Sequence, residues 1–181
     1  MNFYADFLCQ EIKAGCSVCG DHCLCERNES GTAYVLCDGI GSGIYANIAA
    51  ITCAERLMEL QRCGVSPRAA SEMVAESMRR AREENVPFSA FSAANILPDG
   101  HFTVYAYEAP APILIHDAAA KTLAGRVYTA GYEVISEFVG KLENGDALIL
   151  SSDGVTQSGM GHGYGFGIGS EGVAEFINHN S

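Results

Sequence analysis

The sequence predicts an α+β fold in which two consecutive helices interrupt a set of mainly antiparallel strands. Apolar residues recur at helical spacing over residues 44–58 and again over residues 70–81. Residues 91–108 instead alternate in polarity around the turn Pro98-Asp99-Gly100, which is typical of a β-hairpin. With 181 residues the chain is long enough for one domain with a substantial core, so we expect a single domain over residues 1–181.

The first half of the chain is predicted to contain three strands and two helices. The strands are expected at residues 3–13, 23–27 and 32–37. The first helix follows the glycines after Asp38, should end near Gly64 and is expected to be mostly buried. The apolar residues at helical spacing are Ile44, Ile48, Ile51 and Met58, together with Ala50, Ala54 and Leu57. Ser66 and Pro67 have the N-cap and first-turn pattern of a second helix, which should end before Pro87.

The second half is predicted to be mainly strands. The hairpin over residues 91–97 and 101–108 is followed by strand candidates at 112–116, 133–139 and 147–151. A glycine-rich stretch at 159–169 is expected to form a mobile loop, and a short helix over about residues 170–177 should close the fold.

Charge and hydropathy exclude several classes of function. The formal net charge is −11, with 22 acidic and 11 basic side chains, so the protein should repel nucleic acid and anionic membranes. No apolar run approaches the roughly 20 residues needed to span a bilayer. The N-terminal residues lack the basic and apolar pattern of a secretory signal, so we expect a cytoplasmic protein.

Four of the eight cysteines, Cys16, Cys19, Cys23 and Cys25, lie close together in the sequence. Their C-x2-C-x3-C-x-C spacing differs from zinc patterns, in which two cysteine pairs are separated by a dozen or more residues. A structural zinc or iron–sulfur site is the less favoured interpretation, and the role of the cluster stays open. Cysteines in apolar runs, such as Cys37 and Cys53, are expected to be small buried hydrophobes.

Two segments share a pattern in which a hydrophobic strand ends in an aspartate followed by glycine. They are Ala33 to Gly39, with Asp38 at its end, and Ala147 to Gly154, with Asp153. Asp21 also follows a glycine, at a turn into a strand. Carboxylates at strand ends are held rigidly, and glycine lets ligands or carbonyl groups come close. We therefore expect the three aspartates to converge on divalent metal ions that assist phosphoryl chemistry.

The glycines after Asp38 allow two other interpretations. Residues 41–46 fit the G-x-G-x-x-A dinucleotide fingerprint, which would suggest a nicotinamide-dependent oxidoreductase. A second helix follows where that fold needs a parallel strand, and Asp38 would repel a pyrophosphate. The glycines could also serve only to end a strand and begin a helix. Both interpretations rank below the metal site.

Three motifs, in this order along the chain, resemble metal-dependent protein phosphatases of the PP2C superfamily, most closely the bacterial sporulation stage II E (SpoIIE) branch. They are Val18-Cys19-Gly20-Asp21, Cys37-Asp38-Gly39-Ile40-Gly41-Ser42-Gly43 and Ser151-Ser152-Asp153-Gly154-Val155. The most specific of them is the D-G-I-G-x-G helix start. The stretch Phe91-Ser92-Ala93-Ala94, with Glu108 to Pro112, also resembles the central hairpin of the family.

The resemblance implies an α-β-β-α sandwich of two mainly antiparallel sheets flanked by helices, with two divalent cations, Mn²⁺ or Mg²⁺. It implies that Asp38 bridges both metals, that the Gly39 carbonyl binds one of them, and that Asp21 and Asp153 complete much of the coordination. Asp38 and Asp21 are therefore the expected catalytic residues. The implied activity is hydrolysis of phosphoserine or phosphothreonine on a bacterial regulatory protein, such as an anti-sigma-factor antagonist.

The chain departs from the family pattern in one respect. Family members usually carry a further metal-binding aspartate near the C-terminus, and this chain has no aspartate after Asp153. Either the sequence is a fragment that stops at Ser181, or one metal is bound weakly. The second case favours an alternative function, a catalytically weak regulatory or interaction domain that keeps the phosphatase fold. No basic residue for gripping phosphate is assigned, although Lys13 is a candidate.

Overall fold

Two antiparallel sheets form the centre of the molecule, in a computed structural model that describes residues 5–12, 15 and 17–180. The larger sheet has the strand order β1-β2-β3-β4-β8-β7, and the smaller has the order β6-β5-β9. The strands of the larger sheet are β1 (Asp21–Asn28), β2 (Gly31–Gly39), β3 (Ser89–Ile96), β4 (His101–Tyr107), β7 (Arg126–Ala130) and β8 (Glu133–Lys141). Those of the smaller sheet are β5 (Ile113–His116), β6 (Ala119–Thr122) and β9 (Ala147–Ile149).

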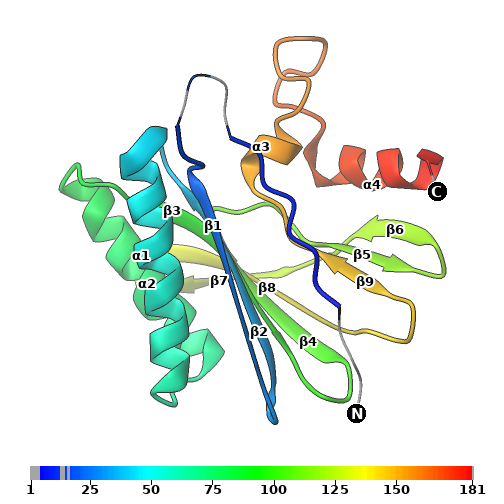
Figure 1. The fold of residues 1–181 in the computed structure, drawn as a ribbon, viewed down its shortest axis with the longest axis horizontal. Helices are drawn as coiled ribbons and strands as arrows, with labels where there is room; N and C mark the ends of the chain where they lie inside the picture. The colour runs from blue at the N-terminus through cyan, green and yellow to red at the C-terminus, as the bar shows by residue number, and fades with distance from the viewer. Residues whose placement is uncertain (1–4, 13–14, 16, 181) are drawn as a thin grey trace.

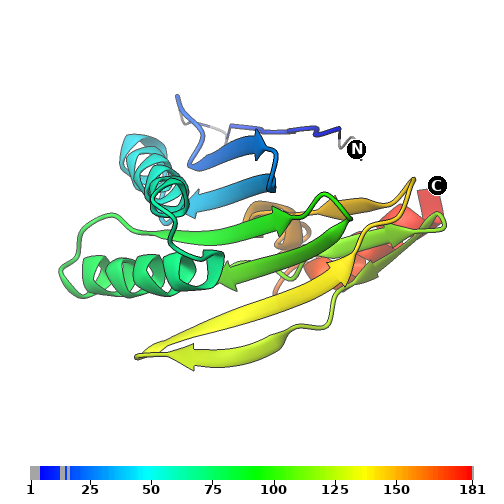
Figure 2. The same cartoon turned by 90° about the horizontal axis from the view of Figure 1, so that it is seen from below.

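Helices cover the outer faces of the two sheets. They are α1 (Gly43–Arg62), α2 (Pro67–Glu83), the short α3 (Asp153–Thr156) and α4 (Gly169–Asn180). Figures 1 and 2 show α1 and α2 together on one side of the molecule and α4 beside the small sheet on the other. The predicted α+β sandwich of two antiparallel sheets flanked by helices is confirmed.

Three apolar cores separate the layers. Side chains such as Val35, Leu57 and Val74 fill the space between the large sheet and its two helices. The opposite face of the large sheet packs against the small sheet through residues that include Val104 and Leu114. A smaller third core lies between the small sheet and α4. Each face of the large sheet is therefore buried, which explains why β3 and β4 carry apolar or small side chains on both faces.

The packing of α1 differs from the prediction. Its buried face is made of small residues together with Leu57 and Met58, and includes Ala46, Ala49, Ala50, Cys53 and Ala54. Ile44 and Ile48 point to solvent and are 53% and 51% exposed, and Ile51 is 37% exposed. The predicted apolar line is therefore right for Ala50, Ala54, Leu57 and Met58, which are buried, and wrong for the three isoleucines. Small side chains let the helix lie close to the sheet and leave the bulky isoleucines outside.

The predicted first strand over residues 3–13 is also wrong for its described part. Residues 5–12 have no regular secondary structure and are all exposed, and even the apolar Phe7, Leu8 and Ile12 are not buried against a sheet. Side chains hold this segment near β1. Arg27 donates a hydrogen bond to Asp6 at 2.7 Å, and the Gln10 amide donates to the Asp21 carbonyl at the same distance.

The other predicted elements appear with small differences in their ends, whereas β6, β7 and α3 were not predicted. The connection from β2 runs through α1 and α2 to β3, and β3 lies antiparallel to β2. This topology excludes the parallel β-α-β unit of a dinucleotide-binding fold, so the oxidoreductase interpretation was wrong. Within the described ranges, no helix is both long and apolar enough to cross a membrane.

One polar pair ties two strands of the small sheet together at their ends. Nδ1 of His116, at the end of β5, lies 2.8 Å from Oδ1 of Asp146, just before β9. The Asp146 side chain is 4% exposed, and its other oxygen accepts a hydrogen bond from the Glu143 backbone N–H. The hydrogen bond to Asp146 raises the pKa of His116, with the charges of Asp146 and Asp117 adding to the effect.

This pair should make stability depend on pH. Because the pKa of His116 is higher in the folded chain than its ordinary 6.5, the pair stabilises the fold fully below that value. The stabilisation is then lost as the pH rises through the raised pKa. Chemical denaturation at pH 6 and pH 8 should show a smaller pH effect in Asp146→Asn and His116→Gln than in the wild type. Additive effects of the two substitutions in the double variant would contradict the coupling.

Candidate metal centre

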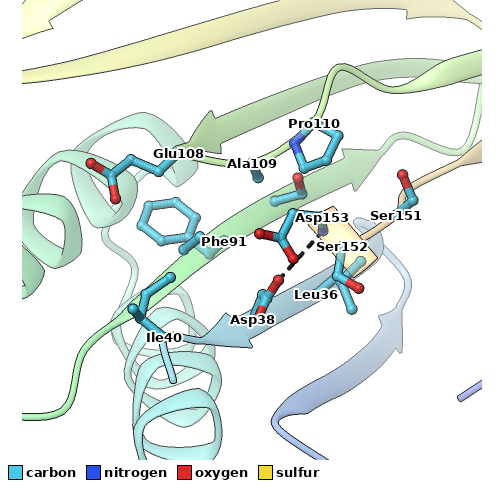
Figure 3. Close-up of a pocket in the computed structure, with 12 residues that line it drawn as sticks. Leu36, Asp38, Ile40, Phe91, Glu108, Ala109, Pro110, Ser151, Ser152 and Asp153 are labelled. Atoms are coloured by element: carbon cyan, nitrogen blue, oxygen red, sulfur yellow. Dashed lines mark hydrogen bonds between the residues drawn. The ribbon is translucent and has the colours of Figure 1, made fainter. Parts of the chain in front are cut away.

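Three aspartates from separate elements meet at one end of the sandwich. Asp21 begins β1 and stands opposite Asp38 near the end of β2, where the two are partners in the strand register. Asp153 begins α3, and residues 150–152 separate it from the end of β9 in the other sheet. The prediction that Asp153 stands at the end of a strand was therefore wrong, since a helix carries it. Figure 3 shows Asp38 and Asp153 facing each other across the space between the sheets. The structure thus brings together the three side chains that the sequence singled out.

Hydrogen bonds connect these residues across the two sheets. The Ser152 hydroxyl donates to Oδ2 of Asp21 at 2.7 Å, and the Asp153 backbone N–H donates to Oδ2 of Asp38 at 3.4 Å. The Gln157 amide donates to Oδ2 of Asp153 at 2.8 Å, one helical turn further on. Ser152 and Gln157 therefore orient two of the three carboxylates.

Asp38 has the most perturbed environment of the three carboxylates. Burial, followed by the negative charges of Asp21 and Asp153, raises the pKa of Asp38 from 3.8 to about 7. Hydrogen bonds with the same two residues act in the same direction. Burial and like charges both penalise the ionised form, so the metal-free site favours a protonated Asp38 near neutral pH.

Gly39 is required by a close approach of two backbones. A Cβ atom on this residue would lie 1.9 Å from the carbonyl oxygen of Ala46 in α1. The Gly39 N–H donates to the Gly20 carbonyl at 3.2 Å, which ties the turn before β1 to the end of β2. Glycine therefore places the first turn of α1 against the strand that carries Asp38.

A shallow pocket opens beside the carboxylates (Figure 3). It lies between the large sheet and the chain that enters α3, and the volume open to the centre of a water molecule is about 20 Å³. Its lining residues are Leu36, Asp38, Ile40, Ala90, Phe91, Ser92, Glu108, Ala109, Pro110, Ser151, Ser152 and Asp153. The pocket is thus bordered by two of the three aspartates.

The donor set fits a hard divalent cation. Three carboxylates and a nearby backbone carbonyl offer only oxygen, which Mg²⁺ and Mn²⁺ prefer over softer ligands. A cation would also offset the repulsion that raises the pKa of Asp38. Among the residues described, however, no three Asp, Glu, His or Cys side chains are arranged to hold a metal as they stand. The ligand roles of Asp21, Asp38, Gly39 and Asp153 therefore stay predictions.

The cysteines near Asp21 are free thiols in the described residues. Cys19 donates a weak hydrogen bond to the Glu11 carbonyl at 3.5 Å. Burial raises the pKa of Cys23, with smaller contributions from Cys25 and Asp6, so its thiolate is disfavoured. Cys16 and the phosphate-binding candidate Lys13 lie outside the described residues.

Sequence reasoning missed the residues that support the carboxylates. Ser152 was part of the quoted S-S-D-G motif, but its bond to Asp21 joins residues 131 positions apart and has no local signal. Gln157 could have been found from its i, i+4 spacing to Asp153, had α3 been predicted.

A family model described as stage II sporulation protein E (SpoIIE) matches residues 28–179. No curated protein matches the chain. Among solved structures, the PP2C phosphatase domain of SpoIIE from Bacillus subtilis is similar with a TM-score of 0.72 and 18% identity, over 86% of this chain and 47% of that one. A crystal structure of RsbX in complex with magnesium has a TM-score of 0.64 and 18% identity, over 94% of this chain and 82% of that one.

A third similar structure contains the RsbU and RsbW domains of Rv1364c from Mycobacterium tuberculosis, with a TM-score of 0.67 and 18% identity. The match covers 80% of this chain and 42% of that one. At these identities the solved structures show that the fold is shared.

The environment of Asp38 predicts how the metal-free protein responds to pH. Between pH 3.8 and about 7 the folded chain retains a proton that the unfolded chain has lost, so the contribution of Asp38 to stability falls as the pH rises through this range. Asp38→Asn removes that penalty. Thermal unfolding in EDTA should show a higher Tm for Asp38→Asn than for the wild type at pH 8, and little difference at pH 4.

The matched control is Glu29→Gln, which neutralises an exposed carboxylate in the turn between β1 and β2. It should leave the difference in Tm between pH 4 and pH 8 as it is in the wild type. A lower Tm for Asp38→Asn at pH 8 would show that the aspartates do not repel one another in the folded chain.

Proposed function

Because the chain belongs to the stage II sporulation protein E (SpoIIE) family, we propose that it is a metal-dependent protein serine/threonine phosphatase. The observation that carries the proposal is the meeting of Asp21, Asp38 and Asp153 at one end of the sandwich, where Asp38 and Asp153 line a shallow pocket. SpoIIE from Bacillus subtilis, one of the similar structures, has a PP2C phosphatase domain. RsbX, another of them, was crystallised in complex with magnesium.

In this proposal Asp38 is the central ligand of two divalent cations, Mn²⁺ or Mg²⁺. Asp21, Asp153 and the Gly39 carbonyl would share the remaining contacts with them. Such cations activate a water molecule for attack on phosphorus and neutralise charge on the phosphoryl group. The protein itself positions the carboxylates, with Ser152 holding Asp21 and Gln157 holding Asp153.

The surface around the pocket favours a protein substrate. Residues 39–54, which lead from Asp38 into α1, contain no charged side chain, although the whole chain has a net charge of −11. Ile44 and Ile48 are about half exposed there. On the other side of the pocket, residues 154–170 also lack Asp, Glu, Lys and Arg, and Phe166 is 93% exposed. An uncharged apolar rim suits contact with a folded partner.

We further propose that the substrate is a phosphorylated bacterial regulatory protein of the anti-sigma-factor antagonist type, and that the chain acts in the cytoplasm. The support comes from one of the similar structures, which contains an RsbU domain together with an RsbW domain. Another belongs to the bacterial stressosome, described as a modular system that has been adapted to control secondary messenger signaling.

A second candidate is a catalytically weak interaction domain that retains the fold. It is favoured by the fact that, among the described residues, no three acidic, histidine or cysteine side chains are arranged to hold a metal. The two candidates differ in their response to metal. The interaction domain should bind its partner equally well with and without Mn²⁺.

Asp38→Asn should abolish hydrolysis of a phosphoserine peptide in the presence of Mn²⁺. The expected loss is more than about a hundredfold, because removing groups that merely hydrogen-bond to metal ligands already costs about 10- to 100-fold. Release of phosphate would be measured over a range of Mn²⁺ concentrations, with Glu29→Gln as the matched control. Activity of Asp38→Asn close to that of the wild type would rule out the central role of this carboxylate.

Ile48→Lys should weaken hydrolysis of a phosphoprotein while leaving that of a small phosphate ester unchanged. Ile48 is 51% exposed on α1, so the substitution changes the rim and leaves the buried face of the helix intact. We expect about a tenfold rise in KM for the protein substrate, equal to the 1.4 kcal/mol that a factor of ten represents. Val139→Lys, at a more exposed position of β8 (68%), is the control and should change neither reaction. Equal effects on both substrates would show that Ile48 does not contact the partner.

A further inference from the structure

One buried polar group in the pocket has no partner in the described part of the protein. Ser92 is 1% exposed, its hydroxyl makes no hydrogen bond to another described residue, and it lines the same pocket as Asp38. A buried hydroxyl without a partner loses its hydrogen bonds to water without replacing them, so folded proteins seldom keep one without a reason.

The strand register places Ser92 close to Asp38. In the pairing of β2 with β3, Asp38 stands opposite Ala90, and Leu36 stands opposite Ser92. Ser92 and Asp38 are therefore diagonal neighbours on the same face of the sheet, the face that packs against the small sheet. The Cβ atoms of such diagonal neighbours lie about 7 Å apart. Since the Ser92 hydroxyl makes no direct hydrogen bond to Asp38, this spacing suits one bridging molecule between the two side chains.

The size of the pocket fits one water molecule. Its volume open to a water centre is about 20 Å³, and about 10 to 15 Å³ is enough for a single water. A buried water usually makes about three hydrogen bonds to groups that lack other partners. Ser92 and Asp38 supply two such groups, and Ser151 and Ser152 line the same space. Ala90 contributes only a methyl group, which leaves room above it.

We propose that Ser92 is a positioning residue that binds one ordered water molecule and, through this water, orients the Asp38 carboxylate toward the cations. The water is held between the Ser92 hydroxyl and the inner side of the carboxylate. This inference deepens the proposed function, and its metal-binding part rests on that function. No bond is made or broken at Ser92 itself.

A crystal structure of the metal-free wild type at high resolution tests the water directly. We expect one ordered water within hydrogen-bond distance of the Ser92 hydroxyl and the Asp38 carboxylate. In Ser92→Val the side chain should fill the space and exclude that water. A pocket without water in the wild type would overturn the proposal, whether or not the protein proves to be a phosphatase.

Calorimetry with Mn²⁺ tests the effect on Asp38. Ser92→Ala should bind Mn²⁺ about 10- to 100-fold more weakly than the wild type, the usual effect of removing a group that orients a metal ligand. Ser92→Thr keeps the hydroxyl and should restore most of the affinity. The Tm measured without metal should differ little between these variants. If Ser92 served only to stabilise the fold, the substitutions would change this Tm and leave Mn²⁺ affinity unchanged.

The control is Thr122→Val, which removes another buried hydroxyl that has no partner among the described residues but lies in β6, outside the pocket. It should leave Mn²⁺ affinity unchanged. Equal Mn²⁺ affinity in the wild type and Ser92→Ala would overturn the role of Ser92. If the wild type binds Mn²⁺ and Ser92→Ala binds it more weakly, but neither hydrolyses a phosphopeptide, the proposed function fails and the role of Ser92 stands.

Discussion

The burial of Asp38 beside two other carboxylates is the physical constraint on which the arrangement of the site depends. Asp21 and Asp38 are fixed opposite each other by the pairing of β1 with β2, and neither can move away without breaking that pairing. Asp153 approaches from the other sheet and adds a third negative charge. The pKa of Asp38 is raised to about 7, first by burial and then by the charges of Asp21 and Asp153, which shows the cost of keeping this carboxylate in the cluster. A fold that keeps such a cluster must be stabilised elsewhere, and the cores on both faces of the large sheet provide that stability.

The packing of α1 follows from the same site. Gly39 lets the strand pass against the carbonyl of Ala46, and the small residues that follow keep the helix close to the sheet. The bulky side chains of the helix, Ile44 and Ile48, are then left on the outside, next to the pocket. The close packing that fixes Asp38 therefore also produces the apolar rim. Part of the surface proposed for the protein substrate is a consequence of how the metal ligands are held.

The sequence predicted those parts of the fold and site that depend on local patterns. The strand end at Asp38-Gly39, the Ser66 N-cap and the turn around Asp99 are decided within a few residues, and the structure has each of them. The predicted strand end at Asp153 was wrong, because β9 ends at Ile149 and Asp153 begins a helix. Sequence patterns gave wrong predictions where the burial of a residue depends on distant parts of the chain. Ile44 and Ile48 have helical spacing, but which face of α1 is buried depends on how closely the helix approaches the sheet. The Ser152 bond to Asp21 and the exposed segment 5–12 likewise depend on contacts between distant residues.

The site is built across the two sheets, so its geometry depends on how the sheets pack. Asp21 and Asp38 belong to the large sheet, whereas Asp153 follows β9 of the small sheet. The bonds that cross this gap near the aspartates are that of Ser152 to Asp21 and the longer one from the Asp153 N–H to Asp38. Asp153 itself begins a helix of only four residues, which is too short to be stable without its tertiary contacts. A cation bound by all three aspartates would join the two sheets where these bonds are sparse. Metal binding should therefore stabilise the contact between the two sheets at this end, and that contact should in turn strengthen metal binding. The reason is that both favour the same arrangement of the carboxylates.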